Sequence, residues 1–372
     1  MRVGLDATPL LGRRTGIGRY VAGLTAGLQS LPDRPDVVLT AFTWRGASAL
    51  RDEPGTTVAT RRAPARLLQH AWQRLGVPPV EWLCGPVDVF HATNFVLPPT
   101  RRAAGVVTIA DLSFVRHADT VSDATLRYRT LVPLSLRRAD VVCAITATLA
   151  EEIAEQYGVE RDRISVTTLG VGDEWFATSP PDAAARRALG LPDDYVAFVG
   201  TQEPRKNLPV LLEAYRALLA EDPGFPPLVL VGPPGWGPAL DASGLPLGAV
   251  VVPGFLDDAA LRGVVAGAKA LVLPSRYEGF GLPPLEALAC GTPVVVSDLA
   301  PLREVLGAWA TYVAVDDVDA LAAGLGHVVR AGRGGFGAEE GRRAQARQHT
   351  WQRCAEQTLA AYRQAVAART AR

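Results

Sequence analysis

The chain has 372 residues, with 38 basic and 38 acidic side chains and therefore a formal net charge of zero. A neutral chain has no overall field to recruit nucleic acid or anionic lipid, so any anion site must be local. At about 150 residues per domain, the length predicts two to three domains with large cores and excludes a small module.

The four cysteines are far apart and form no CxxC pair, which argues against a zinc site or a disulfide framework and fits a reducing cytoplasm. The N-terminal stretch MRVGLDATPL contains no long apolar segment, so no signal peptide is expected. No run approaches the roughly 20 apolar residues of a transmembrane helix. We therefore predict a cytoplasmic protein.

Short β-branched runs alternate with helical stretches along the chain. The first series is RVGLDA, VVLTAFT, VDVFHA, GVVTIAD, DVVCAIT and ISVTTLG, and the second is YVAFVG, PLVLVG, AVVVPG, ALVLPS, PVVVSD and TYVAV. Nearly continuous apolar strands between helices are typical of parallel sheets covered on both faces. The pattern predicts two doubly wound, Rossmann-like α/β domains, with ligands bound in a cleft beyond the carboxyl ends of the strands.

A Gly- and Pro-rich segment near residues 170–180 separates the two series and reads as a hinge followed by a short helix. We expect an N-terminal domain over 1–172 and a C-terminal domain over 173–350. An Arg- and Ala-rich helical pattern runs from about Ala338 to the end. Its last part, 351–372, is predicted as a C-terminal helix, for which a return to the N-terminal domain is an open alternative.

Two adjacent cations follow one predicted strand of the second half. The segment YVAFVGTQEPRKNL reads as a strand ending at Gly200, a turn carrying Arg205 and Lys206, and a helix from about Leu208. These cations suit a diphosphate, because Arg makes a forked contact and Lys supplies a point charge. A solvated helix start is the alternative, but cations there oppose the helix dipole unless an anion joins them. Lys206 is also one of only two lysines in the chain.

Glu278 and Glu286 lie eight positions apart in YEGFGLPPLEALACGTPVV. The glycines and the two prolines predict a loop up to Leu282 and a helix that starts near Pro284. Gly291 is expected to end that helix. This places Glu286 in the first helical turn and Glu278 in the loop that faces the same helix N-terminus.

The amides of Phe280, Gly281 and Leu282 are predicted to point off this helix N-terminus and to suit a phosphate. Glu286 is then placed to accept hydrogen bonds from ribose hydroxyls, and Glu278 from the hydroxyls of a sugar beyond the phosphates. The alternative is that both carboxylates only complement the helix dipole. That alternative leaves the intervening glycines and prolines unexplained.

The spacing of Glu278 and Glu286 resembles the Glu, seven residues, Glu motif of retaining GT-B glycosyltransferases of glycosyltransferase family four. GTQEPRKNL resembles the phosphate-binding segment of that family, and VPGFLDDAAL, residues 252–261, its base-binding turn. GLDATPLLGRRTGIGRYV, residues 4–21, is similar to the opening of bacterial mannosyltransferases of polysaccharide assembly. The resemblance covers nearly the whole chain.

The resemblance implies a role for each matching position. It implies diphosphate contacts at Arg205 and Lys206 beside Gly200, and ribose contact at Glu286. It implies donor-sugar contact at Glu278 with the backbone of Phe280, Gly281 and Leu282. It also implies a base-binding turn at Phe255 and Leu256 and a loop of Gly16 and Gly18 that faces the phosphates. Glu278, Arg205, Lys206 and Asp111 are the implied catalytic residues. Neither a metal nor a cofactor is expected, and the five histidines show no metal spacing.

One position departs from the pattern of the resembled family. Its members carry His-Asp where this chain has Ala110 and Asp111, and they place that histidine near the reaction centre. His91 and His117 match neighbouring segments and do not replace it. Ala110 therefore keeps open a non-catalytic relative that binds a sugar nucleotide.

The resemblance implies a retaining, metal-independent hexosyltransferase that uses a nucleotide diphosphate sugar, with GDP-mannose favoured and UDP-sugars next. The expected acceptor is a glycan, a lipid-linked glycan or a small molecule, and no nucleic acid partner is expected. A basic amphipathic helix over 61–76 leaves two interpretations open, a half-buried surface helix and a peripheral contact with the inner face of the membrane. A nicotinamide dehydrogenase lacks support, because no GxGxxG turn directly follows a strand with an acidic residue about twenty positions on.

Overall fold

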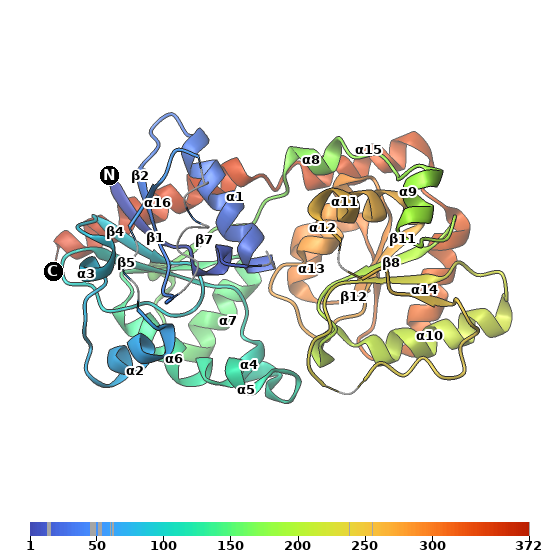
Figure 1. Cartoon of the computed structure of the whole chain (residues 1–372), viewed down its shortest axis with the longest axis horizontal. Helices are drawn as coiled ribbons and strands as arrows, with labels where there is room; N and C mark the ends of the chain where they lie inside the picture. Colours follow the sequence, from blue (N-terminus) through green and yellow to red (C-terminus); the bar gives the residue numbers. More distant parts are fainter. Residues whose placement is uncertain are drawn as a thin grey trace. The chain divides into compact units, whose positions relative to one another are not determined.

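The computed structural model describes residues 1–12, 16–44, 50, 54–59, 61, 63–237, 239–254 and 256–371. The chain divides into two compact units, each built around its own sheet (Figure 1). Unit 1 comprises Met1–Val115, Asp123–Gly170 and His349–Arg372, and unit 2 comprises Arg116–Ser122 and Val171–Gln348.

Unit 1 contains a seven-stranded sheet in the order β3-β2-β1-β4-β5-β6-β7, in which all neighbouring strands run parallel. The strands are β1 (Arg2–Asp6), β2 (Asp36–Thr40), β3 (Thr57–Val58), β4 (Val89–Ala92), β5 (Ala104–Ile109), β6 (Val141–Ala144) and β7 (Ile164–Val166). Strands β4, β5 and β6 are buried along their whole length, as expected for a parallel sheet covered on both faces.

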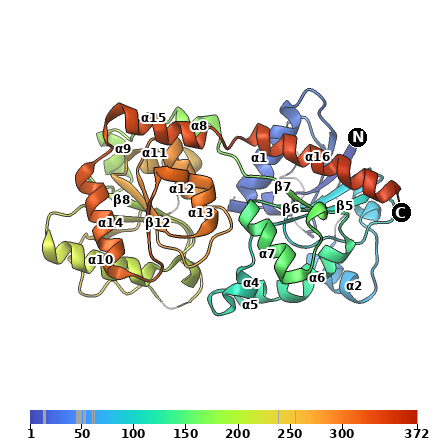
Figure 2. The same cartoon turned by 180° about the vertical axis from the view of Figure 1, so that it is seen from behind.

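The helices of unit 1 are α1 (Gly16–Ser30), α2 (Ala65–Arg74), α3 (Glu81–Cys84), α4 (Ser113–Arg116), α5 (Asp123–Leu126), α6 (Tyr128–Arg138), α7 (Ala147–Tyr157) and α16 (Trp351–Thr370). The C-terminal helix α16 packs along α1 and against β5 and β6 (Figure 2). A Cβ at Gly27 of α1 would lie 2.4 Å from the carbonyl oxygen of Trp351. The two helices therefore approach this closely because Gly27 has no side chain.

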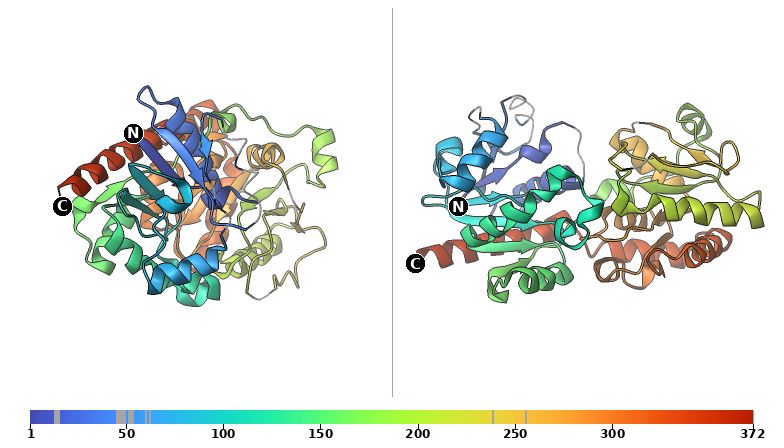
Figure 3. Two further views of the ribbon diagram at one scale, coloured as in Figure 1. Left: turned by 60° about the vertical axis from the view of Figure 1, so that its left-hand side comes forward. Right: turned by 90° about the horizontal axis from the view of Figure 1, so that it is seen from below.

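Unit 2 contains a six-stranded parallel sheet in the order β10-β9-β8-β11-β12-β13. Its strands are β8 (Val196–Val199), β9 (Leu228–Val231), β10 (Val250–Val251), β11 (Ala270–Leu273), β12 (Val294–Ser297) and β13 (Thr311–Val313). Its helices are α8 (Asp173–Phe176), α9 (Ala183–Ala188), α10 (Leu208–Glu221), α11 (Asp258–Gly267), α12 (Leu282–Ala289), α13 (Ala300–Leu306), α14 (Val318–Ala331) and α15 (Gly335–Ala346). Helix α10 packs on α14, and α12 packs on α15. Figure 3 shows the chain from two further directions, with the same colouring along the sequence.

The predicted fold class, two parallel α/β units, is confirmed, and each of the twelve predicted strands is present. Two local expectations were wrong. The sequence pattern missed β3, which has only two residues. The helical pattern from Ala338 onward is interrupted, because Thr350 begins a new helix: its side-chain oxygen accepts a hydrogen bond from the Arg353 amide at 3.1 Å.

Helix α2 is a surface helix in this structure. Leu68 and Trp72 are buried, and the Trp72 indole donates a hydrogen bond to the Pro78 carbonyl at 2.9 Å. Leu67 is 68% exposed on the same helix. Among the helices of the described residues, none is long and apolar enough to span a bilayer.

Candidate active site

The turn after β8 places the predicted cation pair at the carboxyl end of the unit 2 sheet. A Cβ at Gly232, where φ is +143°, would lie 2.1 Å from the Gly200 carbonyl oxygen, so a glycine is required there for the two backbones to approach. A 3-10 helix, η5 (Pro204–Lys206), follows, and Asn207 in the left-handed region leads into α10. The helix begins at Leu208, as predicted.

Lys206 and Glu278 form a buried ion pair. The Lys206 Nζ atom lies 2.6 Å from Glu278 Oε1, and the two side chains are 11% and 8% exposed. The Ser275 hydroxyl donates to the same carboxylate oxygen at 2.6 Å. The structure thus brings together residues 72 positions apart whose direct contact the sequence did not predict.

Arg205 joins this pair through its guanidinium group. Its Nη1 atom donates to the Tyr277 carbonyl at 2.7 Å and lies 3.3 Å from Glu278 Oε2, while Nη2 lies 2.6 Å from Glu203 Oε1. Two cations and two carboxylates therefore compensate each other in a compact network. The network fixes the orientation of Arg205, since its fork is held from both sides.

The electrostatics of Glu278 show that it is ionised. Burial raises the pKa of this carboxyl, but the charges of Lys206 and Arg205 and the hydrogen bonds from Lys206 and Ser275 outweigh burial and lower the pKa to about 2. A buried carboxylate with such strong partners is a candidate for a functional site, because structural carboxylates are mostly exposed.

The loop after Glu278 leads into α12 through a glycine that no other residue replaces without strain. Gly281 is the N-cap of α12 with φ at +91°, and a Cβ there would lie 2.4 Å from the Leu302 side chain. Pro283 lies in the first turn, where its missing amide proton costs no intrahelical hydrogen bond. Phe280 and Leu282 are buried on either side of the cap.

Glu286 lies about two positions deeper in its helix than predicted. Helix α12 begins at Leu282 and not near Pro284, so no acidic residue lies in its first turn. The prediction was wrong because prolines are accepted beyond the first position of the first turn. Glu286 is 3% exposed and lies on the same short helix whose N-terminus follows Glu278.

The predicted base-binding turn is described only in part. Phe255 lies outside the described residues, whereas Leu256 is half-buried directly before α11. Asp257 is the N-cap of α11, and its side chain accepts a hydrogen bond from the Ala260 amide at 2.7 Å. This segment therefore turns from β10 into a helix at the carboxyl edge of the same sheet.

The unit 1 residues of the prediction lie at the carboxyl ends of β1 and β5. Gly16 begins α1, and Gly18 is buried within its first turn. Ala110 and Asp111 follow β5, and Asp111 Oδ1 accepts hydrogen bonds from the Ser113 amide at 2.9 Å and its hydroxyl at 2.6 Å. Asp111 is thus held by its own turn.

The other two histidines discussed in the sequence belong to different units. His91 is fully buried in unit 1, where its ring contacts the Tyr362 hydroxyl at 2.8 Å and the Thr108 hydroxyl at 2.7 Å. Burial lowers the pKa of His91 to about 3. His117 is grouped with unit 2, where its ring lies 5.4 Å from the ring of Tyr277, next to Glu278.

Three residues near the cation pair were not anticipated. They are Glu203, which binds Arg205, Ser275, which binds Glu278, and Asp316, whose Oδ1 accepts from Asn207 Nδ2 at 2.9 Å. Ser275 lies three positions before Glu278 on the same turn, a local signal that the sequence carried. Asp316 is more than 100 positions from its partner, and no sequence pattern indicates that contact.

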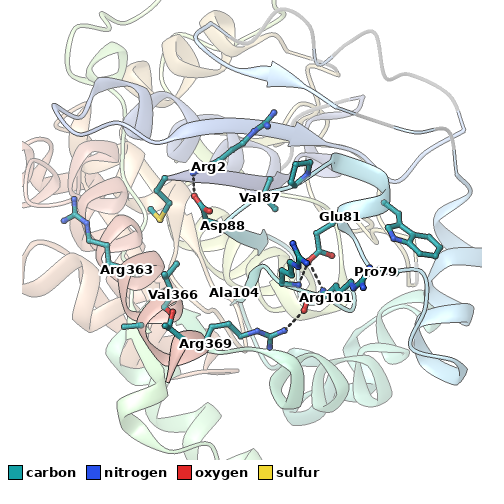
Figure 4. A pocket seen from close by; sticks show the side chains of 16 residues that line it. Arg2, Pro79, Glu81, Val87, Asp88, Arg101, Ala104, Arg363, Val366 and Arg369 are labelled. Atoms are coloured by element: carbon teal, nitrogen blue, oxygen red, sulfur yellow. Dashed lines mark hydrogen bonds between the residues drawn. The ribbon is translucent and has the colours of Figure 1, made fainter. Parts of the chain in front are cut away.

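A cavity of about 1120 Å³ lies at the other edge of the unit 1 sheet (Figure 4). Arg2 and Ala104, at the first positions of β1 and β5, line it, together with Glu81 and Arg369. Glu81 Oε1 accepts hydrogen bonds from the amides of residues 101–103. None of the predicted site residues lines this cavity, so the candidate site is distinct from it.

All four cysteines are free and buried. Within the described part of the chain, no cluster of three or more His, Cys, Asp or Glu side chains could hold a metal ion.

Comparisons with known proteins identify the class of this fold and site. Residues 15–170 match the model of the glycosyl transferase 4-like domain, and residues 193–331 match that of the glycosyl transferases group 1. The chain is 30% identical to O-antigen chain mannosyltransferase B of Escherichia coli over 98% of its own length and 100% of that protein. It is 34% identical to D-inositol 3-phosphate glycosyltransferase of Saccharomonospora viridis, over 77% of this chain and 69% of that one.

Solved structures agree with this class at the level of the fold. The crystal structure of WaaG, a glycosyltransferase involved in lipopolysaccharide biosynthesis, matches with a TM-score of 0.71 at 17% identity, covering 96% of this chain and 98% of that one. HepE of Anabaena in complex with UDP and glucose matches with a TM-score of 0.69 at 18% identity, over 96% and 98% of the two chains. The chain belongs to the glycosyltransferase family of the group 1 and 4-like domains and has the GT-B fold. Within this family it is akin to bacterial mannosyltransferases.

Proposed function

We propose that this glycosyltransferase moves a hexose, with mannose favoured, from a nucleotide diphosphate sugar to an acceptor hydroxyl and retains the anomeric configuration. GDP-mannose is the favoured donor and a UDP-sugar the next candidate. The product belongs to polysaccharide, glycolipid or glycosylated-metabolite synthesis. The observation that carries the proposal is the buried network of Arg205, Lys206 and Glu278 beside the N-terminus of α12.

The network suggests a division of labour around the donor. Arg205 and Lys206 stabilise the diphosphate, and the α12 N-terminus adds the favourable end of its dipole. Glu278 holds both cations in position and accepts a hydrogen bond from a hydroxyl of the donor sugar. Glu286 accepts from the ribose hydroxyls.

The reaction follows from the charge that develops on the leaving group. The bond between the anomeric carbon and the diphosphate oxygen breaks, and its electron pair leaves with the nucleoside diphosphate. The acceptor oxygen forms the new bond on the same face, and its proton passes to the leaving phosphate. Positioned cations and amides stabilise this charge, which contributes several kcal/mol in comparable sites.

We also propose that the reaction needs no divalent metal ion. Arg205, Lys206 and the α12 N-terminus supply the positive potential that a metal ion supplies in other transferases. Asp317 and Asp319 have the spacing of an Asp-x-Asp pair, but Asp317 is the N-cap of α14, where its side chain accepts from the Ala320 amide at 2.9 Å.

Ala110 was the basis for the alternative of a non-catalytic relative, and the comparisons do not favour that alternative, since the relatives matched along the chain are named as transferases. If the leaving phosphate takes the proton, a side-chain base at position 110 is not obligatory. An Ala110→His variant is therefore expected to keep the fold and to alter rate or acceptor preference.

The test is a panel of nucleotide sugars against the purified chain. Thermal shift with GDP-mannose, GDP, UDP-glucose and UDP ranks the donors, because binding to the folded state raises apparent stability. Nucleotide release and NMR of the product then measure transfer and anomeric configuration. Binding without transfer or hydrolysis across a broad acceptor panel, with activity gained only in Ala110→His, would overturn the enzyme assignment.

A further inference from the structure

Two loops of unit 2 carry the ion pair of the candidate site. The loop after β8 carries Arg205 and Lys206, and the loop after β11 carries Glu278. Strands β8 and β11 are neighbours in the sheet. The two loops are also joined by their backbones, because the Arg276 amide donates a hydrogen bond to the Arg205 carbonyl at 2.9 Å. The positions of the two cations therefore depend on how firmly the two loops are held together.

A single carboxylate oxygen from outside both loops contacts a side chain of each. Asp316 Oδ1 accepts a hydrogen bond from Asn207 Nδ2 at 2.9 Å and another from Arg276 Nε at 2.8 Å. Asn207 directly follows Lys206, and Arg276 lies two positions before Glu278. Asp316 therefore connects the near neighbours of both partners of the ion pair, across 109 and 40 positions of the sequence.

The backbone is in the left-handed region at both ends of the contact between Asn207 and Asp316. Their φ angles are +59° and +61°. Of the three residues other than glycine that have positive φ in the described part of the chain, two are this hydrogen-bonded pair. Glycine would adopt these angles with less strain. The contact between the two side chains gives a separate reason for Asn and Asp at these positions.

The side chain of Asn207 serves this contact and not the start of its own helix. Asn207 is the N-cap of α10, but its side chain makes no capping hydrogen bond. The side chain is 1% exposed, and its Oδ1 atom has no hydrogen-bond partner among the described residues. A buried acceptor without a partner is destabilising. The hydrogen bond from Nδ2 to Asp316 is therefore the polar contact that accounts for an amide at this position.

Two other aspartates that follow strands of this sheet make only local contacts. Asp298 follows β12, and its Oδ2 atom accepts a hydrogen bond from Arg303, five positions away on α13, at 2.7 Å. Asp317 is the N-cap of α14 and accepts from the Ala320 amide at 2.9 Å. Asp316 differs from both, because its two partners come from loops that follow two other strands.

We propose that Asp316 is a positioning residue of the diphosphate site. It acts through Asn207 and Arg276, whose loops it holds together, so that Arg205 and Lys206 are aligned toward one ligand. A nucleoside monophosphate lacks the second phosphate group, so loss of this alignment weakens the binding of diphosphates selectively. The inference rests on the proposed binding of a nucleotide diphosphate sugar and adds a residue that belongs to none of the motifs found in the sequence.

Asp316→Gly is the discriminating variant, because glycine accepts the φ of +61° and removes the carboxylate. Asp316→Asn keeps an acceptor oxygen and a residue type that tolerates this φ. Calorimetry with GDP, GMP, UDP and UMP gives the ratio of diphosphate to monophosphate affinity for each base. For the base that the wild type binds, we expect Asp316→Gly to lower this ratio by about tenfold and Asp316→Asn to keep it within about threefold. Asp298→Ala, which removes an exposed ion pair after β12, is the matched control and should keep the wild-type ratio.

Asn207→Gly provides an independent check, because it also fits its backbone angle and removes the Nδ2 donor. Alone it should lower the affinity ratio, and in the Asp316→Gly background it should lower it no further, since both changes break one connection. An unchanged ratio in Asp316→Gly, an equal loss of diphosphate and monophosphate affinity, a loss in Asp316→Asn as large as in Asp316→Gly, or additive effects of the two glycine variants would each overturn the role of Asp316. If the wild type binds none of the four nucleotides, the proposed function is overturned and this role with it.

Discussion

Two buried polar networks of this protein use opposite chemistry. In unit 2, Lys206, Arg205 and Glu278 are ionised and compensate one another. In unit 1, His91, Thr108 and Tyr362 are joined by hydrogen bonds of 2.7 and 2.8 Å and carry no charge, because burial lowers the pKa of the imidazole to about 3. Both networks connect residues far apart in the sequence, but the His91 side chain is fully buried whereas Arg205 and Lys206 are 14% and 11% exposed.

The difference in charge between the two networks indicates which buried polar groups serve a function. The neutral network ties α16 to β4 and β5 and satisfies every ring nitrogen of His91, which is what stability requires. Burying the ionised network costs the desolvation free energy of several charges, at a place where apolar side chains would pack as well. A charged ligand explains this cost more readily than a contribution to stability does. The predictions below test this distinction.

The largest effect is expected for Lys206→Ala. Loss of a charge-assisted contact to the leaving group should lower kcat/KM by more than about 2 kcal/mol, roughly 30-fold. Initial rates of nucleotide release measure this loss. They are taken below the thermal midpoint of the variant, because Glu278 loses one of its two cationic partners and unit 2 is expected to be less stable. Lys269→Ala is the control: Lys269 is 42% exposed and pairs with Asp194 on the surface, so its loss should be mild. Similar rates for both variants would refute the diphosphate assignment.

His91→Ala should act on stability rather than on chemistry. It leaves the Tyr362 and Thr108 hydroxyls buried with fewer partners and opens a cavity, which together cost about 2 kcal/mol or more in the free energy of unfolding. Denaturant unfolding measures the loss. Donor binding should be unchanged when it is measured under conditions in which the variant is fully folded. A selective loss of donor affinity would contradict the structural role of this network.

The pH dependence of stability should separate the two networks. The unfolded imidazole binds a proton near its ordinary pKa of 6.5, whereas folded His91 binds one only near 3, so its contribution is complete above pH 6.5 and falls as the pH drops toward 3. Glu278, with its pKa lowered from 4.5 to about 2, contributes above pH 4.5 and loses that contribution between 4.5 and 2.

Between pH 6.5 and 4.5, the His91 network should therefore lose up to about 1.4 kcal/mol per pH unit while the Glu278 network is unaffected. The measurement is the difference in unfolding free energy between the wild type and His91→Gln as a function of pH. A difference that stays constant over this range would show that His91 titrates normally in the folded protein.

Glu278 and Glu286 are expected to divide binding and turnover. Glu286→Ala should weaken nucleotide binding more, and Glu278→Ala should lower kcat more, each by about tenfold, because the first is assigned to ribose and the second to the reacting sugar. Calorimetry with the nucleotide and initial rates with the full donor separate the two. Equal effects of both variants on both quantities would remove the division of labour.

The smallest effect is expected on removing divalent metal ions. If Arg205 and Lys206 supply the positive potential at the diphosphate, activity in EDTA should equal activity with added magnesium within error. Initial rates before and after dialysis against EDTA test this. A complete loss that magnesium restores would show that the cation pair is insufficient.

The sequence determined the parts of this protein that depend on local pattern. Runs of buried β-branched residues between helices predicted each of the twelve named strands and the two parallel sheets. The turn of Arg205 and Lys206 and the start of α10 at Leu208 followed from a strand end and a helix signal. The family followed from motif spacing, because a ligand fixes residue types at short distances along the chain.

The tertiary structure decided what depends on contacts between distant residues. Glu278 reaches Lys206 across 72 positions, and Asn207 reaches Asp316 across 109, so whether these charges are free or compensated is not encoded in any window of the sequence. The neutral state of His91 depends on burial beneath α16, 271 positions away at Tyr362. The order of the strands in each sheet is likewise set by the packing of the whole unit rather than by the residues of any one strand.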